Sequence, residues 1–141
     1  VNNAGRSGGG ATAEIPDELW LDVINTNLTS VFLMMKEVLG AGGMLAKKRG
    51  RIINIASTGG KQGVVHAVPY SASKHGVVGL TKALGLELAR TGITVNAVCP
   101  GFVGTPDGRE GARALRRHLA GVRAGDLRPH HRPGADGPVR R

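Results

Sequence analysis

The sequence predicts an α/β fold with a parallel sheet, and three observations between residues 51 and 101 carry this prediction. Residues 52–56 form a short apolar run rich in β-branched side chains, which is typical of a buried parallel strand. Residues 70–92 have helical periodicity and end at a glycine, a common helix stop. Residues 93–98 form a second strand-like run. A strand, a helix and a strand joined by short connections make a βαβ unit.

An amphipathic helix is expected upstream of this unit. Pro16 is suited to a first helical turn. Asn27 is a polar residue on the predicted buried face, where an amide needs hydrogen-bond partners. Residues 40–43 are glycine-rich and end the helix, and residues 47–50 are predicted to be a solvated turn. The apolar side chains that share the face of Asn27 at helical spacing are Trp20, Ile24, Leu28, Val31 and Met35.

Length and composition limit the class of protein. The 141 residues leave room for one domain. No apolar run is long enough to cross a bilayer, so we expect no membrane partner. Cys99 is the only cysteine, which excludes a disulfide within the chain, and we expect it to be a small buried residue. Because no basic-then-apolar leader opens the sequence, we expect a cytoplasmic location.

The positive charge is concentrated at the end of the chain. The net charge is +9, of which residues 107–141 contribute +5, from nine arginines and four acidic residues. These residues include no aromatic side chain for base stacking, so we expect no nucleic-acid partner. Arginine without lysine, beside Gly, Pro, Ala and His, is the composition that G+C-rich DNA gives in an unselected reading frame. Residues 107–141 are therefore predicted to be a disordered basic tail or a frame-shifted translation that begins at Pro106.

Three side chains of the βαβ unit are suited to proton transfer. Tyr70 and Lys74 are four residues apart, so they share one face of a helix. A tyrosine hydroxyl ordinarily ionises near pH ~10, and an ammonium one turn away favours its anion. Ser57 follows the first strand and can hydrogen-bond the same substrate oxygen. This combination suits acid catalysis at a carbonyl or an alcohol while a hydride moves at carbon.

Two other kinds of site are not supported by the spacing of the residues. His66 and His75 have no partners at metal-ligand spacing, so no metal site is expected. The glycines at 8–10 lack both the GxGxxG pattern and the following lysine of the common phosphate-binding loops.

The motifs together resemble the short-chain dehydrogenase/reductase family. They are NNAG at residues 2–5, an asparagine in TNL, a strand-end serine thirteen residues before YSASK, and PG after the next strand. The longer stretches NNAGRSGGGATAE, GRIINIASTGGKQGVVHAVPYSASKHGVVG and TKALGLELARTGITVNAVCPGFV are similar to the ketoreductases of aromatic (type II) polyketide synthases, the actinorhodin type. This resemblance covers residues 1 to about 106.

The resemblance implies a fold and a boundary. Residues 1–106 would be the C-terminal half of a doubly wound parallel-sheet Rossmann fold, an NAD(P)-binding domain without its first strands and its glycine-rich loop. Val1 would then end a strand whose beginning is absent. We therefore expect the 141-residue chain by itself to be inactive.

The resemblance also implies roles for named residues and partners. The catalytic residues would be Asn27, Ser57, Tyr70 and Lys74, with Asn27 holding a water that links the lysine to solvent. NADPH would contact Asn3, Ala4, Gly5, Tyr70, Lys74, Pro100, Gly101, Val103 and Thr105. The substrate, a polyketide bound to an acyl carrier protein, would contact Ser7, Gly8, Gly9 and Ser57. The complete protein would be a homo-oligomer, a tetramer, that acts in antibiotic biosynthesis.

Two alternatives remain open from the sequence. One is a 3-oxoacyl-[acyl-carrier-protein] reductase of fatty-acid synthesis, which has the same four catalytic residues. The other, from a different class, is a non-catalytic binding protein whose basic tail docks on an anionic partner. The complete set of Ser57, Tyr70 and Lys74 argues against the second alternative, because a binding module has no need of all three.

Overall fold

The computed structural model describes residues 1–104, 109, 112–113 and 116–117. It divides into two compact units, Val1–Val103 and Gly104–Arg141. In the second unit the described residues after Gly104 are helical. Thr105 and most of the predicted tail, including its proposed origin at Pro106, lie outside the described residues.

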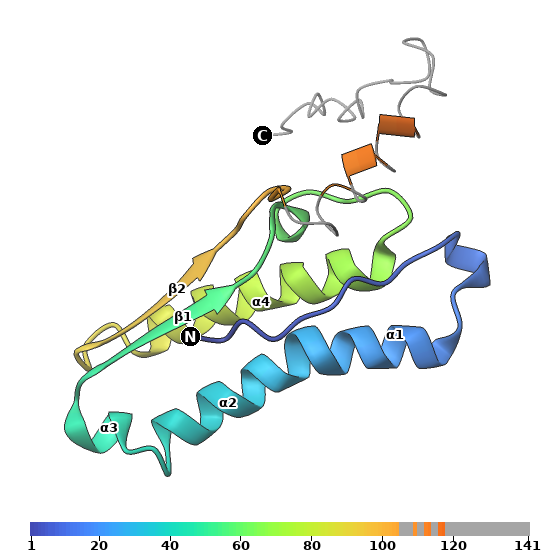
Figure 1. Ribbon diagram of the computed structural model, residues 1–141. Helices are drawn as coiled ribbons and strands as arrows, with labels where there is room; N and C mark the ends of the chain where they lie inside the picture. The colour runs from blue at the N-terminus through green and yellow to red at the C-terminus, as the bar shows by residue number, and fades with distance from the viewer. Residues whose placement is uncertain (105–108, 110–111, 114–115, 118–141) are drawn as a thin grey trace, which may run out of the picture. The chain divides into compact units, whose positions relative to one another are not determined.

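The predicted βαβ unit is present in the first unit. Strands β1 (Gly50–Ile55) and β2 (Ile93–Val98) pair in parallel, in a register that runs from Gly50 opposite Ile93 to Ile55 opposite Val98. Asn2 joins the other edge of β1 by a parallel bridge, because its N–H donates to the Ile53 carbonyl and its carbonyl accepts from the Ile55 N–H. The segment after Asn2 therefore starts beside the carboxyl end of β1 (Figure 1).

Helices cover the sheet and complete a small core (Figure 1). The α-helices are α1 (Asp17–Ile24), α2 (Ser30–Leu39), α3 (Met44–Lys47) and α4 (Val68–Glu87). Short 3-10 turns occupy Thr12–Glu14 and Thr58–Gly60. Side chains from α2, α4, β1 and the residue after β1 form the buried cluster, which comprises Val31, Met35, Ile52, Ala56 and Val77. None of the helices within the described residues is long and apolar enough to cross a membrane.

The upstream helix differs from the prediction in one respect. A π-helical turn at Asn25–Thr29 separates α1 from α2, whereas the sequence predicted one regular helix. Because a π turn holds more residues than an α turn, it shifts the buried stripe of α1 by one residue. Val23 is fully buried, while Trp20, which was predicted to lie on the buried face, is 40% exposed. Asn27 is buried as predicted and lies within the π turn.

Helix α4 also has other bounds than those predicted. It begins two residues before Tyr70, with Pro69 in its first turn, and its α-helical part ends at Glu87 rather than near Gly92. Gly92 instead has a φ of +74° in the turn before β2, a conformation that favours glycine. Short helix α3 was not predicted, and it ends at Lys47, where the predicted turn begins; Lys48 and Arg49 are exposed and non-helical, as predicted. The buried polar residues of α4 are Ser73, Lys74 and Thr81.

Candidate active site at the carboxyl ends of the strands

Ser57 lies two residues after β1, at the edge of the sheet where parallel strands present their carboxyl ends. Its backbone is extended, and its Oγ accepts a hydrogen bond of 3.0 Å from the N–H of Gly59. The hydroxyl thereby caps the 3-10 turn Thr58–Gly60. This bond uses a lone pair of the oxygen and leaves the hydroxyl proton free to be donated.

Tyr70 lies against the same turn. A Cβ atom added to Gly59 would be 3.2 Å from Cε1 of Tyr70 and 3.5 Å from Oγ of Ser57. Both side chains therefore border the small space that glycine leaves at position 59. The structure thus brings together Ser57 and Tyr70, which are thirteen residues apart in the sequence.

Lys74 completes this group from the next turn of α4. Its side chain is buried, and Nζ donates a hydrogen bond of 2.9 Å to the carbonyl oxygen of Ile55. Nζ lies 5.9 Å from the centroid of the Tyr70 ring. Burial lowers the pKa of the Lys74 ammonium, and Cys99 opposes this shift. Among the described residues a single carbonyl accepts a hydrogen bond from the ammonium, which leaves donors for another hydroxyl.

Asn27 reaches this region from the π turn. Its Oδ1 accepts from the backbone N–H of Arg6 at 2.8 Å, and its Nδ2 donates to the carbonyl of Arg6 at 2.9 Å and to Oγ of Ser73 at 3.0 Å. Both amide hydrogens are therefore used by protein partners. The Asn27 side chain therefore holds Arg6, the residue directly after NNAG, by both of its backbone groups.

Ser73 is a polar residue of this region that the sequence reasoning missed. It is fully buried on α4, and its Oγ donates to the carbonyl of Tyr70 at 2.7 Å while accepting from Asn27. A signal was present in the sequence, because a serine directly before Lys74 falls on the buried side of the predicted helix.

The residues predicted to contact the cofactor border the same edge. Asn3, Ala4 and Gly5 are exposed, and a Cβ atom on Gly5 would be 3.4 Å from both Nζ of Lys74 and Oδ1 of Asn27. The absence of that Cβ leaves a small cradle beside an ammonium group. Exposed backbone, a cradle and a lysine donor at the carboxyl edge of parallel strands fit the ribose and nicotinamide portion of a dinucleotide.

The loop after β2 lies next to the loop after β1. The Pro100 carbonyl accepts a hydrogen bond of 2.9 Å from the N–H of Thr58, and a Cβ on Gly101 would be 3.9 Å from Cγ2 of Thr58. Val103 is exposed. Pro100 and Gly101 therefore border the Ser57 turn, whereas Thr105 lies outside the described residues.

The predicted substrate loop packs tightly against two elements. The N–H of Gly10 donates to the His66 carbonyl at 2.8 Å, and a Cβ on Gly9 would overlap that same carbonyl. A Cβ on Gly8 would overlap the side chain of Val23 in α1. Glycine is required here for close approach. Ser7 remains exposed, so it is available to a molecule at this rim.

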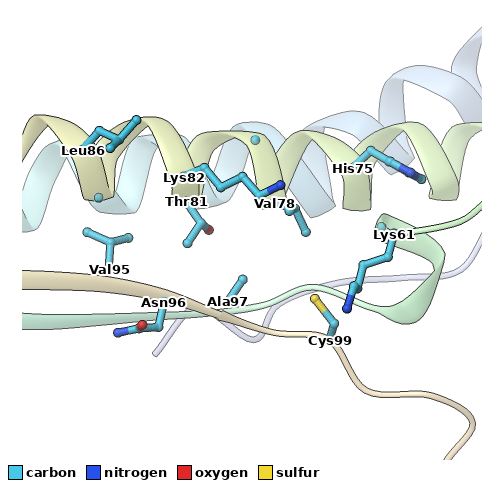
Figure 2. Close-up of a pocket in the computed structure, with 13 residues that line it drawn as sticks. Lys61, His75, Val78, Thr81, Lys82, Leu86, Val95, Asn96, Ala97 and Cys99 are labelled. Carbon is cyan, nitrogen blue, oxygen red and sulfur yellow. The ribbon is translucent and has the colours of Figure 1, made fainter.

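A separate pocket lies between α4 and β2. It has a volume of about 920 Å³, and Lys61, His75, Thr81, Lys82, Asn96 and Cys99 contribute its polar side chains (Figure 2). None of Asn27, Ser57, Tyr70 and Lys74 lines it. The predicted catalytic group is therefore outside this pocket. Within the described residues, no group of three or more His, Cys, Asp or Glu side chains could hold a metal ion.

Comparison with known proteins gives the family. The family model described as "short chain dehydrogenase" matches residues 1–114 of the sequence. One relative, from Streptomyces violaceoruber, is named as ketoacyl reductase 1 of the granaticin polyketide synthase. It is 87% identical to this chain over 122 residues, which are 86% of this chain and 43% of that protein. A 3-oxoacyl-[acyl-carrier-protein] reductase of Vibrio harveyi is 46% identical over 105 residues, 74% of this chain and 42% of that protein.

A solved structure agrees with both the fold and the family. A substituted actinorhodin polyketide ketoreductase, solved with NADPH, has a TM-score of 0.74 and 73% sequence identity, and the match covers 85% of this chain and 44% of that one. The chain thus spans less than half the length of the relatives it matches. A family model that matches most of the chain, and a relative at 87% identity, lead to one conclusion: the chain belongs to the short-chain dehydrogenase family.

Proposed function

We propose that this chain is part of an NADPH-dependent ketoreductase that reduces a ketone of a polyketide bound to an acyl carrier protein. One observation carries the proposal: Ser57, Tyr70 and Lys74 meet at the carboxyl ends of β1 and β2, beside a glycine cradle at Gly5. The 87% identity to the granaticin relative supports the polyketide substrate class. NADPH as the cofactor is supported by the neighbour solved with it.

Each side chain has a task in this reaction. Tyr70 gives its hydroxyl proton to the ketone oxygen, and Ser57 donates a hydrogen bond that orients and polarises that oxygen. The Lys74 ammonium favours the negative charge that develops on the Tyr70 oxygen, and it has donors left for a ribose hydroxyl. NADPH, when bound, supplies the hydride. Asn27 supports this site by hydrogen bonds to the backbone of Arg6 and to the hydroxyl of Ser73.

The fatty-acid reductase alternative has the same side chains but less support. Its relative from Vibrio harveyi is 46% identical, against 87% for the granaticin relative. The non-catalytic alternative has no supporting observation in the described residues, and most of the proposed docking tail lies outside them. A homotetramer and a cytoplasmic location are part of the proposal and stay predictions, to be checked by light scattering and cell fractionation.

The test measures NADPH oxidation by the complete protein. A bicyclic ketone such as a decalone imitates a cyclised polyketide, and a short 3-oxoacyl thioester imitates the fatty-acid substrate. We expect turnover of both, with a higher kcat/KM for the bicyclic ketone. A strong preference for the linear thioester would favour the fatty-acid alternative, and no oxidation with either would contradict the proposal.

The Tyr70→Phe variant tests the acid. Removing the hydroxyl should lower kcat by about 10²–10⁴-fold, the usual contribution of a general acid, while the Kd for NADPH stays near that of the wild type. Tyr70→Phe keeps the ring beside Lys74 and Gly59, so folding is preserved. His75→Gln, on the exposed side of α4, is the control and should keep its turnover. Near-normal turnover of Tyr70→Phe would refute the assignment.

A further inference from the structure

Two buried hydroxyl groups on α4 share one arrangement. Ser73 and Thr81 are eight residues apart, so they fall on one face of the helix. Each hydroxyl donates to a carbonyl one turn back, Ser73 to Tyr70 at 2.7 Å and Thr81 to Val77 at 2.7 Å. A hydroxyl whose proton is fixed in this way presents its lone pairs in a fixed direction. In Figure 2 the Thr81 side chain projects from α4 toward the strands.

An asparagine of another element uses each of these hydroxyls. Nδ2 of Asn27, in the π turn, donates to Ser73 at 3.0 Å, and Nδ2 of Asn54, in β1, donates to Thr81 at 3.0 Å. Both asparagines are fully buried. The second hydrogen of Asn54 Nδ2 points to the sulfur of Met35 at 3.4 Å, a weak acceptor.

The other end of each amide holds one short segment. Oδ1 of Asn54 accepts from Nδ2 of Asn2 at 2.8 Å, and Oδ1 of Asn27 accepts from the backbone N–H of Arg6 at 2.8 Å. Asn2 and Arg6 are the two ends of residues 2–6. Two amides, each backed by a hydroxyl of α4, therefore fasten both ends of this segment to the helix that carries Tyr70 and Lys74.

We propose that Ser73 and Thr81 are positioning residues that, through Asn27 and Asn54, clamp residues 2–6 and thereby set the distance between Gly5 and Lys74. Gly5 is near the middle of the clamped segment, where a Cβ would be 3.4 Å from Nζ of Lys74. Lys74 lies on α4 between the two hydroxyls and is itself held by the Ile55 carbonyl. The clamp thus fixes the backbone cradle relative to the ammonium.

Directional polar bonds suit this task better than apolar packing. Apolar side chains tolerate small shifts, whereas a buried amide that loses its partner is strongly disfavoured, so the bonded arrangement is unique. No buried side-chain nitrogen or oxygen in the part of the chain that the structure describes lacks a hydrogen-bond partner. Removal of either hydroxyl would leave an asparagine hydrogen without its acceptor, and the clamp would loosen at that end.

The clamp itself does not depend on the proposed function, but its effect on the cofactor does. If residues 3–5 contact NADPH, a loosened segment weakens NADPH binding more than the chemical step. The clamp is therefore tested first without cofactor, by backbone amide hydrogen exchange, and then by NADPH titration of the same variants.

The test uses the complete protein with Thr81→Val and Ser73→Ala. The amide hydrogen of Arg6 reports one end directly, because it bonds to Asn27, and that of Asn2 reports the other, because it bonds to the Ile53 carbonyl. We expect Ser73→Ala to speed exchange at Arg6, and Thr81→Val to speed exchange at Asn2, each by about tenfold or more, as the loss of one buried hydrogen bond implies. The Kd for NADPH should rise by a similar factor in both, and kcat at saturating NADPH should change by a smaller factor than the Kd.

Two controls separate positioning from general stability. Thr81→Ser retains the hydroxyl, so its amide exchange rate at Asn2 and its Kd for NADPH should equal those of the wild type. Thr91→Val removes a hydroxyl that also donates to a backbone carbonyl, that of Leu88 at 2.7 Å, but holds no asparagine of the clamp, so it should change neither. A uniform rise in exchange over the whole unit, or local loosening with an unchanged Kd for NADPH, would overturn the positioning role. Failure of the wild type to bind NADPH would instead refute the proposed function, while the exchange data would still decide the clamp.

Discussion

Lys74 shows how one residue serves both the fold and the site. Its side chain is buried beneath the carboxyl end of β1, where the Ile55 carbonyl holds Nζ at 2.9 Å. A buried ammonium is disfavoured relative to one in water, and this burial lowers its pKa from the ordinary value of 10.5. The charge that we propose helps Tyr70 is therefore lost at a lower pH than for a lysine in solvent.

A direct titration checks this at the residue scale. Reductive methylation of the complete protein with isotope-labelled formaldehyde gives each lysine an NMR signal, and the signal absent from Lys74→Arg belongs to Lys74. We expect that signal to titrate at a lower pH than dimethyl-lysine free in water, since burial penalises the charged form and lowers the pKa of Lys74. Activity that needs the ammonium should fall as the pH rises through the same value. A midpoint at or above that of free dimethyl-lysine would show that the Ile55 carbonyl outweighs burial.

The elements divide into those that the sequence predicted and those that only tertiary contacts explain. Strand β2 has the bounds predicted from its apolar run, and β1 overlaps its prediction closely, because β-branched runs bounded by turns are strong local signals. The π turn at Asn25–Thr29 was not predicted. Its composition is ordinary, and what distinguishes it is the burial of Asn27 against Arg6 and Ser73, which are distant in the sequence.

Glycines in the turn after β1 show the same limit of local reasoning. Gly60 was predicted only as part of a loop, yet it is buried, and a Cβ there would be 2.5 Å from the carbonyl oxygen of Lys74. This close approach lets the Ser57 turn lie directly on α4. Gly63, three residues later, is exposed and would meet nothing within 4 Å.

These two glycines make a matched pair at the scale of the element. In the complete protein, Gly60→Ala should lower the free energy of unfolding by about 1–3 kcal/mol, the usual effect of overpacking against backbone that has no room to move. It should also lower kcat, because the turn that carries Ser57 is pushed from Tyr70. Gly63→Ala should change stability by less than about 1 kcal/mol, since its φ is not in the left-handed region. Urea unfolding measures both, and equal stabilities would contradict the close packing.

At the scale of the molecule, the site draws on segments that are far apart in the chain. Ser57, Tyr70 and Lys74 were predicted because their spacing is fixed within one βαβ unit. Ser73, Asn54 and Thr81 were not, since their partners are 27 and 46 residues away and no local pattern marks such bonds. Large apolar side chains such as Phe32 and Leu86 are exposed in this chain.

We still predict that the 141-residue chain by itself is inactive.

The last prediction concerns residues 107–141, where nine arginines occur without a lysine. We propose that they are a frame-shifted translation. When codons for DGREGARALRRHL are read one base later, the second base of each codon becomes a first base, and the result is compatible with MAARVREHYADIW. The segment DLRPHHRPGADGPVRR is likewise compatible with TFDRITARVPMGRYV. The middle base of each new codon is free within the degeneracy of the code, so the DNA itself must decide.

Resequencing of the coding DNA around the Pro106 codon is the decisive measurement. We expect the corrected sequence to lack one cytosine there and to continue in the frame that gives MAARVREHYADIW. The +5 charge of these residues would then have no function, and the basic docking tail would be excluded with it. An intact frame that encodes Asp107–Arg141 in independent isolates would refute the shift. Since the four residues proposed to be catalytic precede Pro106, either outcome leaves the proposed active site intact.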